Sequence, residues 1–352
     1  MAFKPEFNIG DRKIGPGHPS YIIAEAGSNH NKNMDTAKEL IDAALRSGSD
    51  AVKFQSFTAD RIAADTSHPI ATLTDEFGQY GSTLRSFYAQ AELPPGWIKE
   101  LFAYAREKGI TPMSTPFDEY AVDELVELGM SAIKIASFEL VHLPLLKHCA
   151  QTGLPMILST GMATLGEIEE ALEAVDKAGG TEVALLHCNI EYPPAMEDIE
   201  LRAINTMRNA FGVPIGFSDH TRGTHIPVAA TALGACVLEK HFTLDRSLKG
   251  PDHGFALEED ELTTMVTSVR EVEKALGRGR KGPVAAEEKH RLRGRRSLFA
   301  SKPIASGTIL SADMLTVLRP GIGLHPRHLD TLIGHPVRQD LQAYDPITWD
   351  CV

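Results

Sequence analysis

Val213-Pro-Ile-Gly-Phe-Ser-Asp-His220 is a short apolar run that stops abruptly at polar residues, and the chain contains eight runs of this kind. The other seven are Tyr21–Ala24, Ala51–Val52, Ile110–Met113, Ala132–Ile135, Met156–Leu158, Val183–Leu186 and Ala235–Leu238. Buried parallel strands have this composition. Helical patterns such as Met34–Ser47 and Leu165–Ala178 lie between the runs, and the alternation predicts right-handed βαβ units. We therefore expect an α/β fold, a (β/α)8 TIM barrel with its active site at the carboxyl ends of the strands.

Polar and charged side chains stand where the predicted strands end. Those suited to binding or catalysis are Glu25, Lys53, Gln55, Thr115, Lys134, Ser137, Glu139, Ser159, Asn189, Ser218, His220 and His241. Because the carboxyl ends of barrel strands meet at one mouth, we expect these side chains to lie close together. A long strand-poor interval, Thr58–Leu93, follows Gln55 and is a candidate substrate loop.

The chain is longer than one barrel needs, so a second domain is expected. Its 352 residues exceed the ~250 residues of a typical barrel. We expect the barrel over residues 1–283, opening with a hairpin at residues 7–15 that plugs the barrel floor. A basic linker over residues 284–296 and a small β-rich domain over residues 297–352 would follow, the latter too short for a large core of its own.

The composition argues against several classes of protein. The formal charge of −12 disfavours nucleic-acid binding, and the basic run Arg278–Arg296 has no interleaved aromatic residues. No apolar stretch reaches the ~18 residues of a membrane span, and Met1–Lys13 lacks the apolar region of a signal peptide. The four scattered cysteines show no CxxC spacing and are expected to be reduced thiols. We expect a cytoplasmic protein with no nucleic-acid or membrane partner.

His220 and His241 are the strongest chemical signal. They end two neighbouring predicted strands, in Gly216-Phe-Ser-Asp-His220 and Leu238-Glu-Lys-His241. Two imidazoles at a barrel mouth could hold a divalent metal, with water and substrate oxygens completing its shell. Alone, either histidine is more often structural, but the pair with Glu25 nearby predicts a metal site.

Lys53 and Lys134 also end predicted strands. A lysine at this place is a Schiff-base nucleophile, an anion anchor or a rim residue in a salt bridge. The surrounding hydroxyls favour the anion anchor, since they suit a phosphate and a carboxylate; they belong to Thr115, Ser137, Ser159 and Ser218. A Schiff-base pyruvate aldolase on a barrel scaffold stays open as the alternative function.

Nine short motifs follow one another along nearly the whole chain. They are Ile23-Ala-Glu-Ala-Gly-Ser-Asn-His30, Val52-Lys-Phe-Gln55, Ser114-Thr-Pro-Phe117, Ile133-Lys-Ile-Ala-Ser-Phe-Glu139, Leu158-Ser-Thr-Gly-Met162, Leu186-His-Cys188 with Tyr192-Pro193, Phe217-Ser-Asp-His220, Glu239-Lys-His-Phe242 and Gly250-Pro-Asp252. Together they resemble the sialic acid (N-acetylneuraminate) synthases and their legionaminate and pseudaminate relatives. The tail, from Arg296-Ser-Leu-Phe-Ala-Ser-Lys302 through Val317-Leu-Arg-Pro-Gly321, resembles the antifreeze-like (SAF, β-clip) domain of that family.

The resemblance implies a transferase that condenses phosphoenolpyruvate with an N-acetylmannosamine-like sugar or a diacetamido-trideoxyhexose. The products would be a nine-carbon 2-keto acid and phosphate. A divalent metal on His220 and His241, manganese first and magnesium or cobalt as alternatives, would polarise the sugar aldehyde. Carbon 3 of the enol would attack, water would add at carbon 2, and phosphate would leave with cleavage of its C–O bond. Glu25 would orient or deprotonate that water, or handle the proton of the sugar oxygen.

By the same resemblance, the other site residues divide between the two substrates. Phosphoenolpyruvate would be held by Lys53, Thr115, Lys134, Ser137, Ser159, Asn189 and Ser218. The sugar would face Gln55, Glu139, Tyr192, Asp252 and Arg319. Arg319 would reach the acyl group of the sugar from a partner subunit, which implies a domain-swapped homodimer.

Two residues depart from the sialic acid synthase pattern. Phe138 stands where a glycine is usual, and Ile190 stands where a polar phosphoenolpyruvate contact is expected, so that Asn189 would substitute for it. Features of the pseudaminate and of the legionaminate branches occur together, which leaves the sugar open. The antifreeze-like tail also raises a non-enzymatic ice-binding or coat role, but its charged, proline-containing sequence lacks the flat, threonine-rich surface that such a role needs.

Overall fold

The computed structural model describes residues 2–74 and 76–352. The chain divides into two compact units, Met1–Gly277 and Arg278–Val352. In the described part of the chain, no helix is both long enough and apolar enough to cross a membrane. All four cysteines are free and buried.

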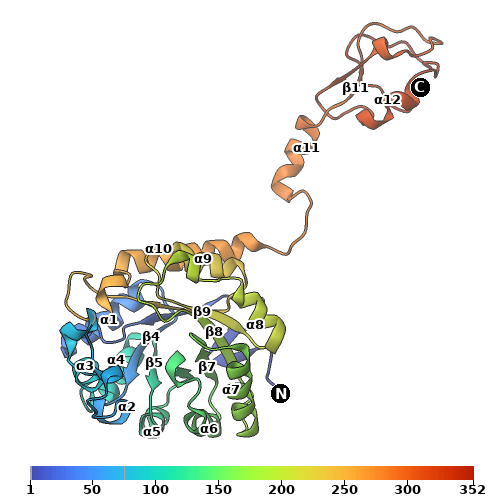
Figure 1. Ribbon diagram of the computed structural model, residues 1–352. Helices are drawn as coiled ribbons and strands as arrows, with labels where there is room; N and C mark the ends of the chain where they lie inside the picture. The colour runs from blue at the N-terminus through green and yellow to red at the C-terminus, as the bar shows by residue number, and fades with distance from the viewer. Residues whose placement is uncertain (1, 75) are drawn as a thin grey trace. The chain divides into compact units, whose positions relative to one another are not determined.

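The first unit is built on a parallel sheet that curls into a barrel (Figure 1). Its eight strands are β3 (Tyr21–Glu25), β4 (Ala51–Ser56), β5 (Thr111–Pro116), β6 (Ile133–Ile135), β7 (Met156–Ser159), β8 (Val183–Cys188), β9 (Ile215–Asp219) and β10 (Val237–His241). They pair in the order β5-β4-β3-β10-β9-β8-β7-β6, and the end strands β5 and β6 lie next to each other. The predicted (β/α)8 barrel is confirmed.

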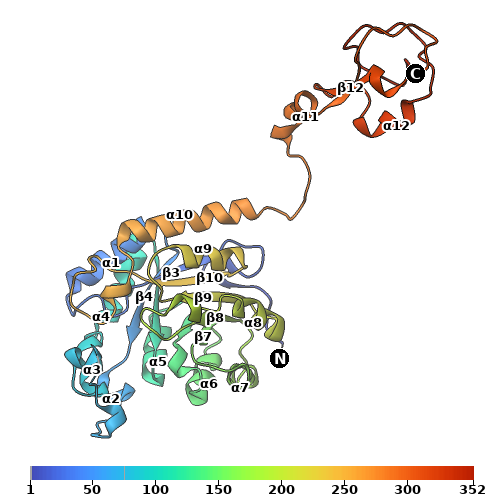
Figure 2. The same cartoon turned by 45° about the horizontal axis from the view of Figure 1, so that its top comes forward.

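Helices surround the strands on the outside of the barrel (Figure 2). They are α1 (Met34–Arg46), α4 (Trp97–Lys108), α5 (Glu119–Glu127), α6 (Leu143–Gln151), α7 (Leu165–Lys177), α8 (Ala203–Phe211), α9 (His225–Ala232) and α10 (Glu259–Leu276). In α1 the buried residues Ala37, Leu40, Ile41 and Ala44 recur at helical spacing and form one apolar stripe. The Asn33 side chain begins this helix by accepting a hydrogen bond from the Thr36 backbone.

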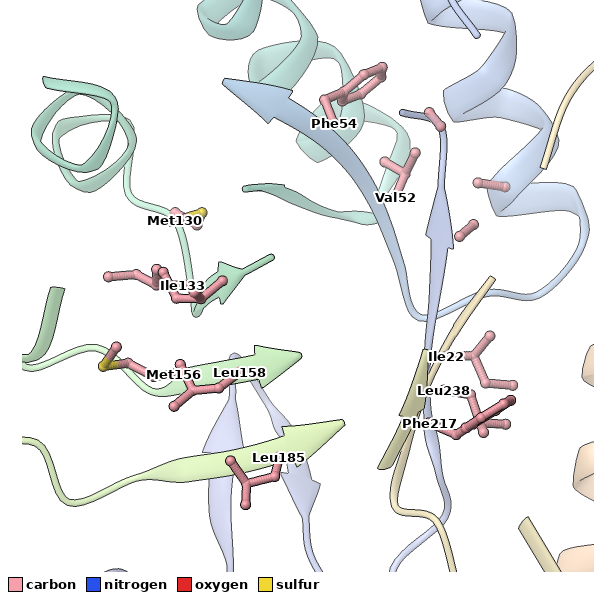
Figure 3. Packing of buried hydrophobic residues seen from close by; sticks show 14 of the residues in the cluster. Ile22, Val52, Phe54, Met130, Ile133, Met156, Leu158, Leu185, Phe217 and Leu238 are labelled. Atoms are coloured by element: carbon pink, nitrogen blue, oxygen red, sulfur yellow. The ribbon is translucent and has the colours of Figure 1, made fainter. Parts of the chain in front are cut away.

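The two faces of the strands build two separate cores. Outward residues such as Ile22, Val52 and Leu185 pack with the helices in the larger core, part of which Figure 3 shows. Inward residues pack with the N-terminal hairpin of β1 (Phe7–Ile9) and β2 (Arg12–Ile14) in a smaller cluster. The hairpin packs at one end of the barrel interior and leaves the carboxyl ends of the strands for the site.

The strands continue beyond the apolar runs into the polar residues. Strand β4 includes Lys53 and Gln55, and β10 includes Glu239 and His241. Because side chains alternate along a strand, these four residues extend the inward row that Ala51 and Val237 begin in the smaller core. The interior of the barrel is thus apolar at the plugged end and polar at the open end.

The long interval after β4 carries two short helices, α2 (Ala59–Ile62) and α3 (Leu84–Ala91). Phe57 makes edge-on ring contacts with Phe117 at 5.3 Å and with Tyr88 of α3 at 5.5 Å. The Tyr80 hydroxyl donates to the Gly250 carbonyl at 3.0 Å. These contacts hold the insertion against residues that follow β4, β5 and β10, at the open end of the barrel.

The second unit has its own small core. It contains α11 (Glu288–Gly294), the antiparallel pair β11 (Ser297–Ala300) and β12 (Leu315–Leu318), and α12 (Leu329–Leu332). Leu298, Leu310, Val337 and Ile347 are among its fully buried side chains. The basic segment 284–296, expected as a linker, includes the short helix α11.

Candidate active site

A cavity with about 400 Å³ of empty space opens at the carboxyl ends of the barrel strands. Eleven of the residues predicted from the sequence line it: Glu25, Lys53, Gln55, Thr115, Lys134, Ser137, Ser159, Tyr192, Ser218, His220 and His241. They come from strands β3 to β10 and from the residues directly after them. The barrel therefore brings together most of the predicted site.

Two lysines and two carboxylates form a buried, charge-balanced cluster in this cavity. Lys53 Nζ lies 2.8 Å from Glu25 Oε2 and 3.8 Å from Glu239 Oε2. Lys134 Nζ lies 3.5 Å from Glu239 Oε1. All four side chains are at most 5% exposed. Each charge is therefore stabilised by its charged partners rather than by water.

The two carboxyl groups of the cluster differ in the direction in which their pKa values are shifted. Burial raises the pKa of Glu25 to about 7, acting against the nearby Lys53 ammonium group. Burial also works to raise the pKa of Glu239, but Lys134 and Lys53 together overcome it and hold that pKa low. The two lysines thus favour the ionised form of Glu239, while Glu25 can exchange a proton near neutral pH.

Hydroxyl groups surround the cluster, as the sequence predicted. Lys53 Nζ donates to Thr115 Oγ1 at 2.9 Å, and Lys134 Nζ donates to Ser159 Oγ at 2.7 Å. Ser218 Oγ donates to Glu239 Oε1 at 3.1 Å. These groups, with the lysines, present several hydrogen-bond donors to one small volume, which suits an oxyanion.

The two predicted metal-binding histidines lie side by side at the same mouth. Their ring centroids are 5.2 Å apart, and Tyr192 stacks on His220 at 4.2 Å. His220 Nδ1 is 2.6 Å from the Asn189 carbonyl, which can only accept, so this nitrogen carries the proton and Nε2 keeps its lone pair. Burial lowers the pKa of each histidine to about 3, which keeps both imidazoles neutral.

This arrangement fits a metal held by two protein ligands. His241 Nδ1 is buried and has no hydrogen-bond partner among the residues that the structure describes, and Asp252 Oδ2 is 4.0 Å from it. Within residues 2–74 and 76–352, no three His, Cys, Asp or Glu side chains form a metal-binding group. The remaining ligands would have to be water and substrate oxygens, as expected for a metal that must keep open positions.

Four predicted residues lie outside the cavity lining. Glu139 belongs to a short turn after β6, and no atom in the described part of the chain forms a hydrogen bond with its buried Oε2 atom. Asp252 accepts hydrogen bonds from the Ser28 backbone and hydroxyl. The Asn189 side chain donates to the Asp198 carbonyl at 2.6 Å, and its contact with phosphoenolpyruvate stays a prediction. Arg319 belongs to the second unit, and its role also stays a prediction.

The sequence reasoning missed one central residue. Glu239 was quoted from the sequence only within the motifs that contain His241 and was given no role, yet it contacts both lysines and Ser218. Strand periodicity could have found it, because it stands two residues before His241 and must face the same way. The lining also includes Phe117, Ala136 and Cys188, which had no predicted role, together with Phe138 and Ile190, the two residues that depart from the sialic acid synthase pattern.

Comparison with known proteins agrees with this geometry. Residues 40–281 match the model of the NeuB family, and residues 295–352 match the SAF domain. The chain is 43% identical over 319 residues to the N,N'-diacetyllegionaminic acid synthase of Campylobacter jejuni, covering 89% of this chain and 94% of that protein. It is 39% identical to the enzyme of the same name from Legionella pneumophila, with 97% of both chains covered.

A solved structure is similar as well. The N-acetylneuraminic acid (sialic acid) synthetase of Leptospira borgpetersenii serovar Hardjo-bovis, solved with citrate, superposes with a TM-score of 0.72 at 35% identity. The match covers 81% of this chain and 94% of that one. The family model spans more than half of the chain, and the relatives match nearly all of it. The chain therefore belongs to the NeuB family and carries a SAF domain at its carboxyl end.

Proposed function

We propose that the chain condenses phosphoenolpyruvate with an acylated amino-hexose of the N-acetylmannosamine or diacetamido-trideoxyhexose type. The products are a nine-carbon 2-keto acid and inorganic phosphate. The observation that carries this proposal is the buried cluster of Lys53, Lys134, Glu25 and Glu239 beside two neutral imidazoles in one cavity. The relatives named as legionaminic acid synthases support the same reaction class.

The lysine side of the cavity suits phosphoenolpyruvate. Lys53 and Lys134 carry the charges that would neutralise its phosphate and carboxylate, and the hydroxyls of Thr115 and Ser159 already orient both ammonium groups. A predicted contact from Ser137 fits the same side, because its Oγ atom accepts the Gly161 N–H at 3.0 Å and lines the cavity. The enol would thus be fixed with its carbon 3 free to react.

The reaction forms one C–C bond and one C–O bond from water, and it breaks the C–O bond to the phosphate. Carbon 3 of phosphoenolpyruvate bonds to the aldehyde carbon of the sugar, water adds to carbon 2, and the bond from carbon 2 to the phosphate oxygen breaks. Glu25, with Gln55 Nε2 donating to it at 2.8 Å, is placed to exchange a proton with this water or with the sugar oxygen. Glu239 stays ionised and stabilises positive charge that develops at carbon 2.

His220 and His241 would hold the divalent metal, manganese first and magnesium or cobalt as alternatives. When bound, such an ion supplies Lewis-acid polarisation of the sugar aldehyde. Tyr192 covers the His220 ring, and the Asn189 carbonyl fixes its orientation. The protein therefore orients the His220 imidazole before substrate arrives.

The proposal includes a domain-swapped homodimer in which Arg319 reaches the sugar of the partner subunit. Exposed apolar side chains follow β6 and β7 at the barrel mouth: Phe138, Val141, Met162 and Leu165. The second unit also exposes apolar side chains, among them Ile309, Ile322, Ile333 and Trp349. Covering both sets in a dimer would remove apolar surface from water. Mixing inactive Lys53→Ala and Arg319→Ala chains should then restore about a quarter of the wild-type rate, since half of the mixed dimers would be hybrids with one intact site.

A direct test of the function supplies phosphoenolpyruvate and Mn²⁺ with each of four sugars and measures phosphate release. The sugars are N-acetylmannosamine, its 6-phosphate and the two diacetamido-trideoxyhexoses. We expect release with one class of sugar, no release without sugar, and loss of release with a chelator. Equal inactivity with all four sugars would contradict the proposal.

A further inference from the structure

A buried ion pair lies on the outward face of strands β9 and β10, directly behind the two histidines. Lys240 Nζ is 2.6 Å from Asp219 Oδ2, and both side chains are 1% exposed. Neither residue lines the cavity, because each alternates along its strand with the inward residues. The pair is therefore distinct from the charged cluster of the active site.

Asp219 shapes the backbone on which His220 stands. Its Oδ1 atom accepts the Thr221 N–H at 2.9 Å, and its Oδ2 atom accepts the Thr221 hydroxyl at 3.1 Å. An aspartate that bonds the backbone two residues on forms an Asx turn. His220 is the middle residue of this turn, so its backbone is held on both sides.

Lys240 connects this turn to the strand that carries His241. Its ammonium group donates to the Thr221 carbonyl as well as to Asp219. Lys240 is also the residue directly before His241, and its strand pairs with β9 through Lys240 and Asp219. One buried side chain thus ties the backbone of the first histidine to the backbone of the second.

We propose that Asp219 and Lys240 are positioning residues that set the separation of the His220 and His241 imidazoles and thereby the affinity for the divalent metal. This inference rests on the metal role of the two histidines in the proposed function. A buried ion pair contributes little net stability compared with apolar residues of the same size, so its presence calls for another reason. Groups that orient ligands without touching the metal commonly change metal affinity by 10–100-fold.

The test removes both charges together, so that no unpaired charge stays buried. The double variant Asp219→Asn with Lys240→Met is compared with wild type for Mn²⁺ binding to the substrate-free protein, by electron paramagnetic resonance of the free ion. We expect the Mn²⁺ dissociation constant to rise roughly 10–100-fold. The phosphoenolpyruvate dissociation constant, measured without metal, should change by less than about threefold, because the lysine cluster is not part of this network.

Two further variants keep the test decisive. Asp50→Asn with Arg270→Met removes a different, part-buried ion pair, 2.8 Å long, beside the amino end of β4, and should lower stability without changing Mn²⁺ affinity. Thr221→Val removes only the hydroxyl contact to Asp219 and should raise the Mn²⁺ dissociation constant by a few-fold in a chain that folds normally.

The outcomes separate this inference from the proposed function. Suppose that the Asp219/Lys240 double variant and the Thr221 variant bind Mn²⁺ with wild-type affinity, while His220→Ala loses this affinity. This result would overturn the positioning role and leave the metal site intact. Unchanged affinity in His220→Ala would overturn the metal site itself and this inference with it. An equal loss of affinity in the Asp50/Arg270 control would show a general stability effect and would also overturn the positioning role.

Discussion

Replacing Glu239 by glutamine should destabilise the ligand-free protein far more than the protein bound to phosphoenolpyruvate. Glu239 is 5% exposed and lies 3.5 Å from Lys134 Nζ and 3.8 Å from Lys53 Nζ. At an effective dielectric constant of about 20, each attraction is worth roughly 4–5 kcal/mol before desolvation is subtracted. Removing one member of a buried ionic group costs about 3–5 kcal/mol in measured cases.

We take about 3 kcal/mol as the expected loss of unfolding free energy for Glu239→Gln without ligand, because Lys53 keeps its contact with Glu25 at 2.8 Å. Phosphoenolpyruvate brings negative charge to both lysines and replaces the missing carboxylate. The loss with saturating ligand should therefore fall to about 1 kcal/mol, and the phosphoenolpyruvate dissociation constant should drop by at least about tenfold.

The assay is urea unfolding of the barrel unit with and without phosphoenolpyruvate, together with calorimetric titration of the ligand. Asp50→Asn serves as the control, because Asp50 forms ion pairs with Arg270 and Arg12 away from the cavity. This variant should lose the same unfolding free energy with and without phosphoenolpyruvate. If Glu239→Gln loses the same stability with and without the ligand, the lysines are not the anion site and the reasoning is refuted.

Three further predictions test other parts of the site. Gly161→Ala places a methyl group 2.5 Å from Ile190 Cδ1 and 2.9 Å from Ser137 Oγ, so the KM for phosphoenolpyruvate should rise roughly tenfold. Adding Ile190→Ala makes room for the methyl group and should reverse part of this rise. An unchanged KM in Gly161→Ala would contradict this packing. Burial raises the pKa of Glu139 from its ordinary 4.5 to about 7, so the carboxyl keeps its proton below neutral pH. The KM for the sugar should then fall as the pH rises through about 7. If the Glu139→Gln variant shows the same fall in KM, the pH dependence belongs to another group. His241→Ala should lose Mn²⁺-stimulated phosphate release by about 100-fold or more, whereas full activity would remove the metal from the mechanism.

The barrel could be predicted because the sequence pattern of each strand is local. Each apolar run needs only a few neighbouring residues to be recognised, and the polar residues that follow it, such as Lys53 and Ser159, must then meet at one mouth. Glu25 and His241 were expected at this mouth because they end predicted strands, and both line the cavity.

The site contacts that the sequence did not predict depend on residues that are far apart along the chain. The pairing of Glu239 with both Lys53 and Lys134 requires side chains from β4, β6 and β10 to meet across the barrel interior. The turn of the Asn189 side chain toward Asp198 is set by the loop after β8. No local pattern encodes either contact, because both follow from closure of the barrel rather than from spacing along the chain.

The most direct measurement follows the oxygen that joins carbon 2 to phosphorus in phosphoenolpyruvate. The labelled compound, with ¹⁸O at this bridging position, is incubated with the enzyme, Mn²⁺ and the accepted sugar, and the phosphate and keto acid are analysed by mass spectrometry. Condensation with C–O cleavage predicts the label in inorganic phosphate and one unlabelled 2-keto oxygen from water for each C–C bond formed. Label in the keto acid, or a borohydride-trapped adduct on Lys53 or Lys134 without phosphate release, would contradict the proposed reaction.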